Sequence, residues 1–88
     1  MADEKQNVLF ALSTCPACRK TKALLDKNNI KYIITELDLI DVESRDKLLT
    51  KVRQYNDRET FPTLVVRGGE KVIVGYDEAE LKEAFNIS

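Results

Sequence analysis

Two cysteines, Cys15 and Cys18, stand three positions apart and are the only cysteines in the 88-residue chain. Thiols at this spacing at the start of a helix close into a small disulfide ring, which opens again when an outside thiol attacks it. In a chain that also shows a strand–helix–strand pattern, the spacing is typical of a thioredoxin-like redox motif. The residues therefore predict thiol–disulfide exchange.

The two thiols are expected to differ in reactivity. Cys15 would lie at a helix N-terminus, where unpaired backbone N–H groups and the helix dipole stabilise a thiolate. Cys18 lies one turn further in, on the same face as Leu25, and should be more buried. We therefore expect Cys15 to attack a substrate disulfide and Cys18 to resolve the mixed disulfide. The chain has no histidine, so the stabilisation must come from the helix and its surroundings.

Two other uses of the cysteine pair are weighed against exchange. A purely structural disulfide is uncommon in a short chain of a reducing compartment. A zinc site needs about four ligands, and one cysteine pair without histidine supplies two. A dimer that holds zinc or an iron–sulfur cluster through Cys15 stays open as a minor alternative. We expect the single chain to bind no metal.

The composition limits the class of protein. The chain is 43% hydrophobic and 33% charged, with a net charge of -1, as in an ordinary soluble domain. We predict one domain over residues 1–88, with no nucleic-acid or membrane partner. Met1–Asn7 is polar and no apolar signal segment follows it. The expected location is the cytoplasm.

The elements that must position the cysteines can be read in order. The apolar run Val8–Leu12 predicts a buried strand. A helix follows through Arg19–Lys27, with Pro16 in its first turn, where a missing N–H costs nothing. Tyr32–Ile34 predicts a second strand, which should be parallel to the first. The cysteine pair therefore lies between a strand and a helix.

The second half predicts a helix, a hairpin and a last helix. Ser44 is the expected N-cap of a helix that runs to about Tyr55. The hairpin strands are expected on either side of a tight turn at Gly68–Gly69. Asp77 is the expected cap of the last helix. The expected strands are Thr63–Val66 and Val72–Val74, and the complete order is βαβαββα.

Three motifs carry a resemblance to a known family. The stretch Cys15–Cys18, with Pro16 and Ala17 between the cysteines, is similar to a Cys-Pro-Tyr-Cys site. Thr60-Phe61-Pro62 is similar to a Thr-Val-Pro motif, and Gly75-Tyr76-Asp77 to a Gly-x-Asp turn. In this order they resemble the glutaredoxin family, within the thioredoxin-like superfamily, over essentially the whole chain. The resemblance implies an α/β thioredoxin-like fold, with a four-stranded mixed sheet flanked by three helices.

The resemblance also implies a substrate groove beside Cys15. Pro62 would follow a cis peptide bond, so that the backbone N–H and C=O of Phe61 face the sulfur and pair with a peptide or glutathione. Thr60 belongs to the same motif. Arg58 would meet a glutathione carboxylate, although a solvated loop charge is an equal reading.

Tyr76 and Asp77 would complete the groove. Asp77 would accept a hydrogen bond from the glutathione amino group, which is compatible with capping the last helix, and Tyr76 would line the groove or pack at the sheet edge. Two departures weaken a glutathione site. Leu12 stands where many glutathione-using members have lysine, and Ala17 stands where most have tyrosine.

The predicted function is that of a dithiol–disulfide oxidoreductase without a tightly bound cofactor. Its partners would be disulfide-containing proteins or glutathione mixed disulfides, with glutathione or another thiol as reductant. Alternatively, electrons would come from a flavoprotein of the thioredoxin-reductase type, as in a redoxin that serves ribonucleotide reductase. The chain is expected to act as a monomer.

Overall fold

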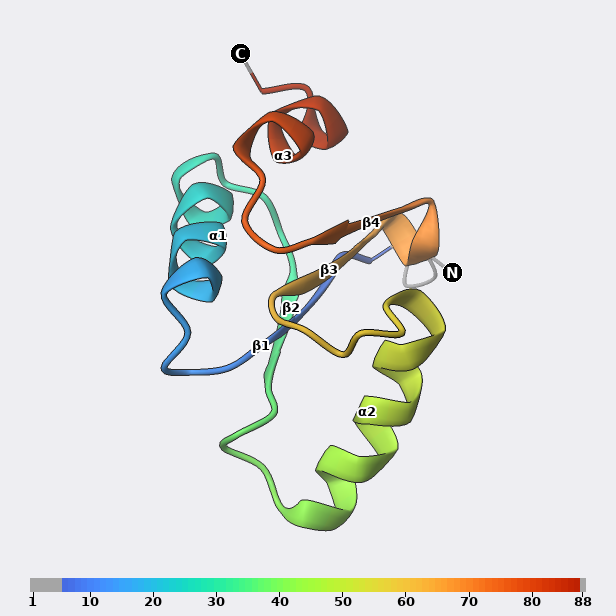
Figure 1. The fold of residues 1–88 in the computed structure, drawn as a ribbon. Helices are drawn as coiled ribbons and strands as arrows, with labels where there is room; N and C mark the ends of the chain where they lie inside the picture. Colours follow the sequence, from blue (N-terminus) through green and yellow to red (C-terminus); the bar gives the residue numbers. More distant parts are fainter. Residues whose placement is uncertain (1–5, 88) are drawn as a thin grey trace.

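The computed structural model describes residues 6–87, which form a four-stranded sheet between two helical layers (Figure 1). Most of Met1–Asn7, which underlies the expectation about a signal segment, lies outside these residues. The order of elements is the predicted βαβαββα, with one added 3-10 turn. The elements are β1 (Val8–Ala11), α1 (Pro16–Lys27), β2 (Ile33–Glu36), α2 (Val42–Tyr55), β3 (Thr63–Val66), η2 (Arg67–Gly69), β4 (Lys71–Val74) and α3 (Glu78–Phe85).

The sheet is mixed, as the predicted fold requires. Its strand order is β2-β1-β3-β4. Strand β1 pairs in parallel with β2 and antiparallel with β3, and β3 pairs antiparallel with β4. Because β1 is central, Leu9, Phe10 and Ala11 are all buried, which confirms the buried first strand.

Each face of the sheet has its own core. Leu9 and Ala11 belong to a cluster with Leu25 of α1 and Leu81 of α3. Phe10, on the opposite face, belongs to the cluster that includes Val52 of α2. The alternation follows from the two-residue period of a strand. Helices α1 and α3 therefore cover one face and α2 covers the other (Figure 1).

The predicted start of α2 was wrong by three residues. The N-cap is Asp41, whose carboxylate accepts a hydrogen bond from the Ser44 N–H at 3.0 Å. Ser44 is thus the donor inside the first turn and not the cap. Aspartate and serine are both good N-cap residues, so the sequence offered two starts. The predicted end at Tyr55 is confirmed.

Several strand boundaries differ from the prediction because pairing determines them. Strand β1 ends at Ala11, one residue before the predicted Leu12, β2 begins at Ile33, one residue after the predicted Tyr32, and β4 begins at Lys71, one residue before the predicted Val72. Strand β2 runs to Glu36, since its ladder with β1 continues as far as the Ala11–Glu36 pair. The hairpin connection is the turn η2 followed by Glu70, longer than the expected two-glycine turn. Gly68 and Gly69 do have positive φ angles, of 69° and 113°.

In the described part of the chain, no helix is both long and apolar enough to cross a membrane.

Candidate active site

The cysteine turn, residues 15–18, connects β1 to α1. Cys15 is the N-cap of α1 and has extended backbone angles, and Pro16 occupies the first helical turn as predicted. The Cys15 N–H donates to the Leu12 carbonyl at 3.2 Å, and the Arg19 N–H donates to the Cys15 carbonyl at 3.1 Å. These bonds fix the sulfur of Cys15 over the start of the helix.

A backbone N–H of the turn forms a hydrogen bond with the sulfur of Cys15. The N–H of Cys18 donates to Cys15 Sγ over an N–S distance of 3.2 Å. This group is one of the helix N–H donors that have no partner within the helix. Cys15 therefore stands where a side chain usually caps a helix, and its sulfur is the capping atom.

The two thiols have unequal surroundings. Cys15 is half-buried, whereas Cys18 is 0% exposed, and neither is in a disulfide. Burial, reinforced by a hydrogen bond with Cys15, raises the pKa of the Cys18 thiol to about 12. Thr21 and Leu25 are buried on the same side of α1, which confirms the predicted inner face. At neutral pH Cys18 holds its proton.

The proline loop, residues 56–62, meets the cysteine turn at one end of the sheet. The Cys15 thiol donates to the Phe61 carbonyl over 3.8 Å. The Phe61–Pro62 peptide bond is cis, as the resemblance implied. The Pro62 carbonyl accepts a hydrogen bond from the Gly75 N–H at 2.8 Å. The loop thus joins the Cys15 sulfur to the turn that precedes α3.

Asn56 holds the proline loop, and sequence reasoning missed it. Its side chain is buried, and its amide nitrogen lies 3.1 Å from the Thr60 carbonyl, the Thr60 hydroxyl and the Thr63 hydroxyl. Its Oδ1 accepts from the Arg58 N–H at 3.2 Å. The available signal was an asparagine directly after α2 and four residues before the Thr-x-Pro motif.

The remaining predicted residues lie around this centre. Arg58 and Thr60 are exposed. Asp77 is exposed and caps α3, since its carboxylate accepts from the Glu80 N–H at 3.1 Å. Tyr76 is 37% exposed, and the ammonium group of Lys20 lies 5.9 Å from its ring centre. The structure therefore brings Tyr76 against α1 but gives the Arg58 side chain no partner within the described residues.

Leu12 and Ala17 are the two residues that depart from the family pattern, and both are partly buried. Leu12 packs against the core under α2. The carbonyl of Ala17 accepts from the Thr21 hydroxyl at 3.0 Å. Neither side chain offers a charge or a ring to a ligand at Cys15. Among residues 6–87, no group of three or more His, Cys, Asp or Glu side chains is arranged to hold a metal ion.

Comparison with known proteins identifies the family. The family model described as Glutaredoxin matches residues 7–72, well over half of the chain. The chain belongs to the glutaredoxin family. Members of this family are thiol–disulfide oxidoreductases that use glutathione as reductant.

Individual glutaredoxins agree with this assignment. Glutaredoxin 1 of Rickettsia prowazekii is 39% identical over 59 residues, which are 67% of this chain and 59% of that relative. The chain thus spans about three fifths of the length of this relative. The crystal structure of Methanosarcina acetivorans methanoredoxin has a TM-score of 0.85 at 33% identity, covering 92% of this chain and 84% of that one. A buckwheat glutaredoxin–glutathione complex has a TM-score of 0.71 at 26% identity, covering 98% and 74%.

Proposed function

We propose that this glutaredoxin-family chain is a dithiol–disulfide oxidoreductase in which Cys15 attacks and Cys18 resolves. The unequal surroundings of the two thiols support this most directly. Cys15 Sγ is partly accessible and receives a backbone N–H at 3.2 Å, whereas Cys18 is fully buried. An attacking thiol needs access and a stabilised anion, and a resolving thiol needs to reach only its neighbour.

The proposed exchange moves two electrons from the dithiol to the substrate. The Cys15 thiolate attacks one sulfur of the substrate disulfide; a new S–S bond forms and the other substrate sulfur leaves as a thiolate. Cys18 then loses its proton and attacks Cys15 Sγ. The second substrate sulfur leaves and takes up a proton, so the substrate ends as two thiols and the protein as the Cys15–Cys18 disulfide.

The proton held by Cys18 gives the two steps their order. Burial keeps this thiol protonated at neutral pH, with its pKa raised to about 12. Cys18 therefore does not compete for an incoming disulfide. Once Cys15 is in a mixed disulfide, the departing thiolate is a base that accepts the proton. The second step therefore follows the first, because it uses the mixed disulfide and the thiolate base that the first step produces.

The substrate groove is proposed to run along the proline loop. The backbone of Phe61, whose carbonyl lies 3.8 Å from Cys15 Sγ, would pair with the chain on either side of the substrate cysteine. Thr60 and Pro62 flank this backbone on either side. By the family resemblance, Arg58, Tyr76 and Asp77 would bind the ends of a glutathionyl group, and a buckwheat glutaredoxin of similar fold forms a complex with glutathione. The proposed substrates are protein disulfides and glutathione mixed disulfides.

Glutathione is the proposed electron source. Two molecules would return the Cys15–Cys18 disulfide to the dithiol and become glutathione disulfide. The second candidate is a flavoprotein of the thioredoxin-reductase type. One observation favours it: Leu12 and Ala17 supply neither the ammonium group nor the aromatic ring typical of a glutathione site.

The test supplies electrons in two ways to the same protein. One assay contains glutathione, glutathione reductase and NADPH, and the other contains thioredoxin reductase and NADPH. We expect disulfide reduction in the glutathione assay. Reduction only with thioredoxin reductase would retain the dithiol chemistry and overturn the proposed donor. A protein that reduces no disulfide in either assay, or when chemically reduced beforehand, would overturn the proposed exchange.

A further inference from the structure

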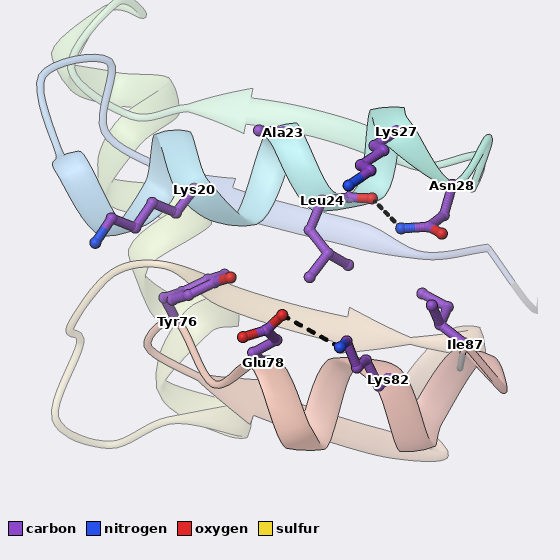
Figure 2. A pocket seen from close by; sticks show the side chains of 9 residues that line it. All are labelled: Lys20, Ala23, Leu24, Lys27, Asn28, Tyr76, Glu78, Lys82 and Ile87. Carbon is purple, nitrogen blue, oxygen red and sulfur yellow. Dashed lines mark hydrogen bonds and ion pairs between the residues drawn. The ribbon is translucent and has the colours of Figure 1, made fainter.

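A groove lies between α1 and α3, beside the site just described. It encloses about 570 Å³. Its α1 wall is a stripe of residues at helical spacing, which runs about 12 Å along the axis from Lys20 to Asn28. Tyr76, Lys82 and Ile87 form the opposite wall (Figure 2). The predicted glutathione site accounts only for Tyr76.

The groove has a charged rim and an apolar centre. Three ammonium groups line it, from Lys20, Lys27 and Lys82, against one carboxylate, Glu78. That carboxylate lies 3.3 Å from Lys82 Nζ and pairs with it, so three ammonium groups against one carboxylate leave the groove a net charge of +2. The apolar surface comes chiefly from Leu24, with Ile87 across the groove (Figure 2). The balance of charge therefore favours an anionic occupant that also carries an apolar group.

One end of the groove adjoins the reactive sulfur. Lys20 lies five residues after Cys15 on the same helix, a rise of about 8 Å. Tyr76 follows Gly75, whose N–H is bonded to the Pro62 carbonyl in the proline loop. Lys20 and Tyr76 are themselves in contact, with 5.9 Å from ammonium to ring centre. A chain bound at Cys15 can therefore continue into the groove.

We propose that the α1–α3 groove binds an acidic segment of the disulfide-bearing protein substrate, in which carboxylates flank an apolar side chain. This rests on the proposed exchange at Cys15. The ammonium groups are spread along both helices, which suits an extended segment better than a compact anion. The apolar side chain would lie against Leu24 and Ile87. The segment selects among substrates, whereas Cys15 and Cys18 carry out the same chemistry on each.

The kinetic test uses two matched peptides and no reductase. Each carries one cysteine linked to 2-mercaptoethanol as a mixed disulfide; beyond the cysteine, one has Glu-Leu-Glu and the other Lys-Leu-Lys. Chemically reduced protein is mixed with each, and peptide disulfide loss is followed by quenching and chromatography. We expect the acidic peptide to react about fivefold faster, corresponding to ~1 kcal/mol. The preference should shrink in high salt.

Charge reversal locates the preference. Lys27→Glu should remove it, whereas Lys47→Glu, the same charge change at an exposed position of α2 on the other face, should retain it. Equal rates for both peptides, or an equal loss in the two variants, would overturn the groove. Bis(2-hydroxyethyl) disulfide, which has no charge and no chain, should react alike with all three proteins. Failure with this small disulfide would instead contradict the proposed exchange.

A binding measurement keeps the inference testable without exchange. The acidic peptide, with serine in place of its cysteine, is titrated into isotopically labelled protein. We expect amide shift changes at Leu24, Lys27 and Ile87, and weaker ones with the basic peptide. Changes confined to the α2 face, or none for the acidic peptide, would exclude the groove as its site.

Discussion

The cysteine turn and the proline loop meet at one end of the sheet but differ in how their polar groups are used. In the cysteine turn, a helix N–H without a helical partner points at a partly exposed sulfur, 3.2 Å away. In the proline loop, the polar groups turn inward onto the buried amide of Asn56. One segment thus holds the sulfur proposed to react, and the other holds a backbone carbonyl beside it.

This difference suggests that reaction and positioning reside in separate segments. The turn keeps donor capacity for a charge that appears during exchange. In the loop, the Asn56 side-chain amide is already used by Thr60 and Thr63, and every buried side-chain nitrogen and oxygen in the described part of the chain has a hydrogen-bond partner. A satisfied polar network is costly to disturb. Substitutions in the turn should therefore affect chemistry first, and substitutions in the loop should affect stability as well.

The largest expected effect comes from the cysteines themselves. Cys15→Ser should reduce disulfide reduction to the rate without protein, because no other thiolate is accessible. Cys18→Ser should lose turnover of protein disulfides but keep turnover of glutathione mixed disulfides, which need only one cysteine. Steady-state rates of both variants with both substrates provide the measurement. An active Cys15→Ser protein together with an inactive Cys18→Ser protein would reverse the two roles.

The next effect tests the loop. Asn56→Ala removes one donor group shared by three acceptors and should lower the free energy of unfolding by about 1–3 kcal/mol. Exchange should also slow, since the loop that carries the Phe61 carbonyl loses its hydrogen bonds to Asn56. The matched control is Asn28→Ala, which loses one exposed hydrogen bond from the side-chain amide to the Leu24 carbonyl. This variant should lower the free energy of unfolding by about 0.5 kcal/mol. Urea unfolding compares them; equal losses would mean that Asn56 has no special role.

A pH effect tests the burial of Cys18. The folded protein keeps this proton up to a pKa of about 12, whereas the unfolded chain releases it near ~8.5. The contribution to stability is therefore complete below ~8.5 and is lost as pH rises towards 12. Above about pH 9, reduced wild type should lose up to ~1.4 kcal/mol per pH unit more than Cys18→Ala. Parallel pH profiles of the free energy of unfolding would place Cys18 in contact with water.

The smallest effect concerns the open side of the turn. Ala17→Tyr should raise kcat/KM for glutathione about fivefold, if the ring covers ~40 Å² of apolar surface worth ~25 cal/mol per Å². Ala23→Tyr, further along α1, is the matched control and should change nothing in this assay. An unchanged kcat/KM in Ala17→Tyr would show that the side chain at position 17 does not limit glutathione binding.

The architecture follows from the sequence because local patterns and their order agree. Val8–Leu12 predicts a buried strand, and Thr21 and Leu25 predict the inner face of α1. The boundaries that failed depend on pairing over a distance. Strand β2 extends to Glu36 because β1 lies beside it, and no residue type near Ile34 indicates that pairing. The start of α2 failed for a local reason, since Asp41 and Ser44 are both capable caps.

The site divides in the same way. The sulfurs could be predicted from type and spacing alone, and the Phe61–Pro62 element from the resemblance. Asn56 could not, because an asparagine after a helix ordinarily indicates a solvated turn. Its amide is buried only because β3 and the loop fold over it. The α1–α3 groove depends on the packing of two helices more than fifty residues apart in sequence, which neither helix encodes by itself.

The two thiols are expected to be unequal in reactivity in the folded, reduced protein. A brief pulse of iodoacetamide at neutral pH, followed by unfolding and mass spectrometry of the peptides, measures this directly. Denatured protein, in which both cysteines should be labelled, is the control. We expect the pulse to label Cys15 and to leave Cys18 unmodified. Equal labelling, or labelling of Cys18 first, would contradict this expectation.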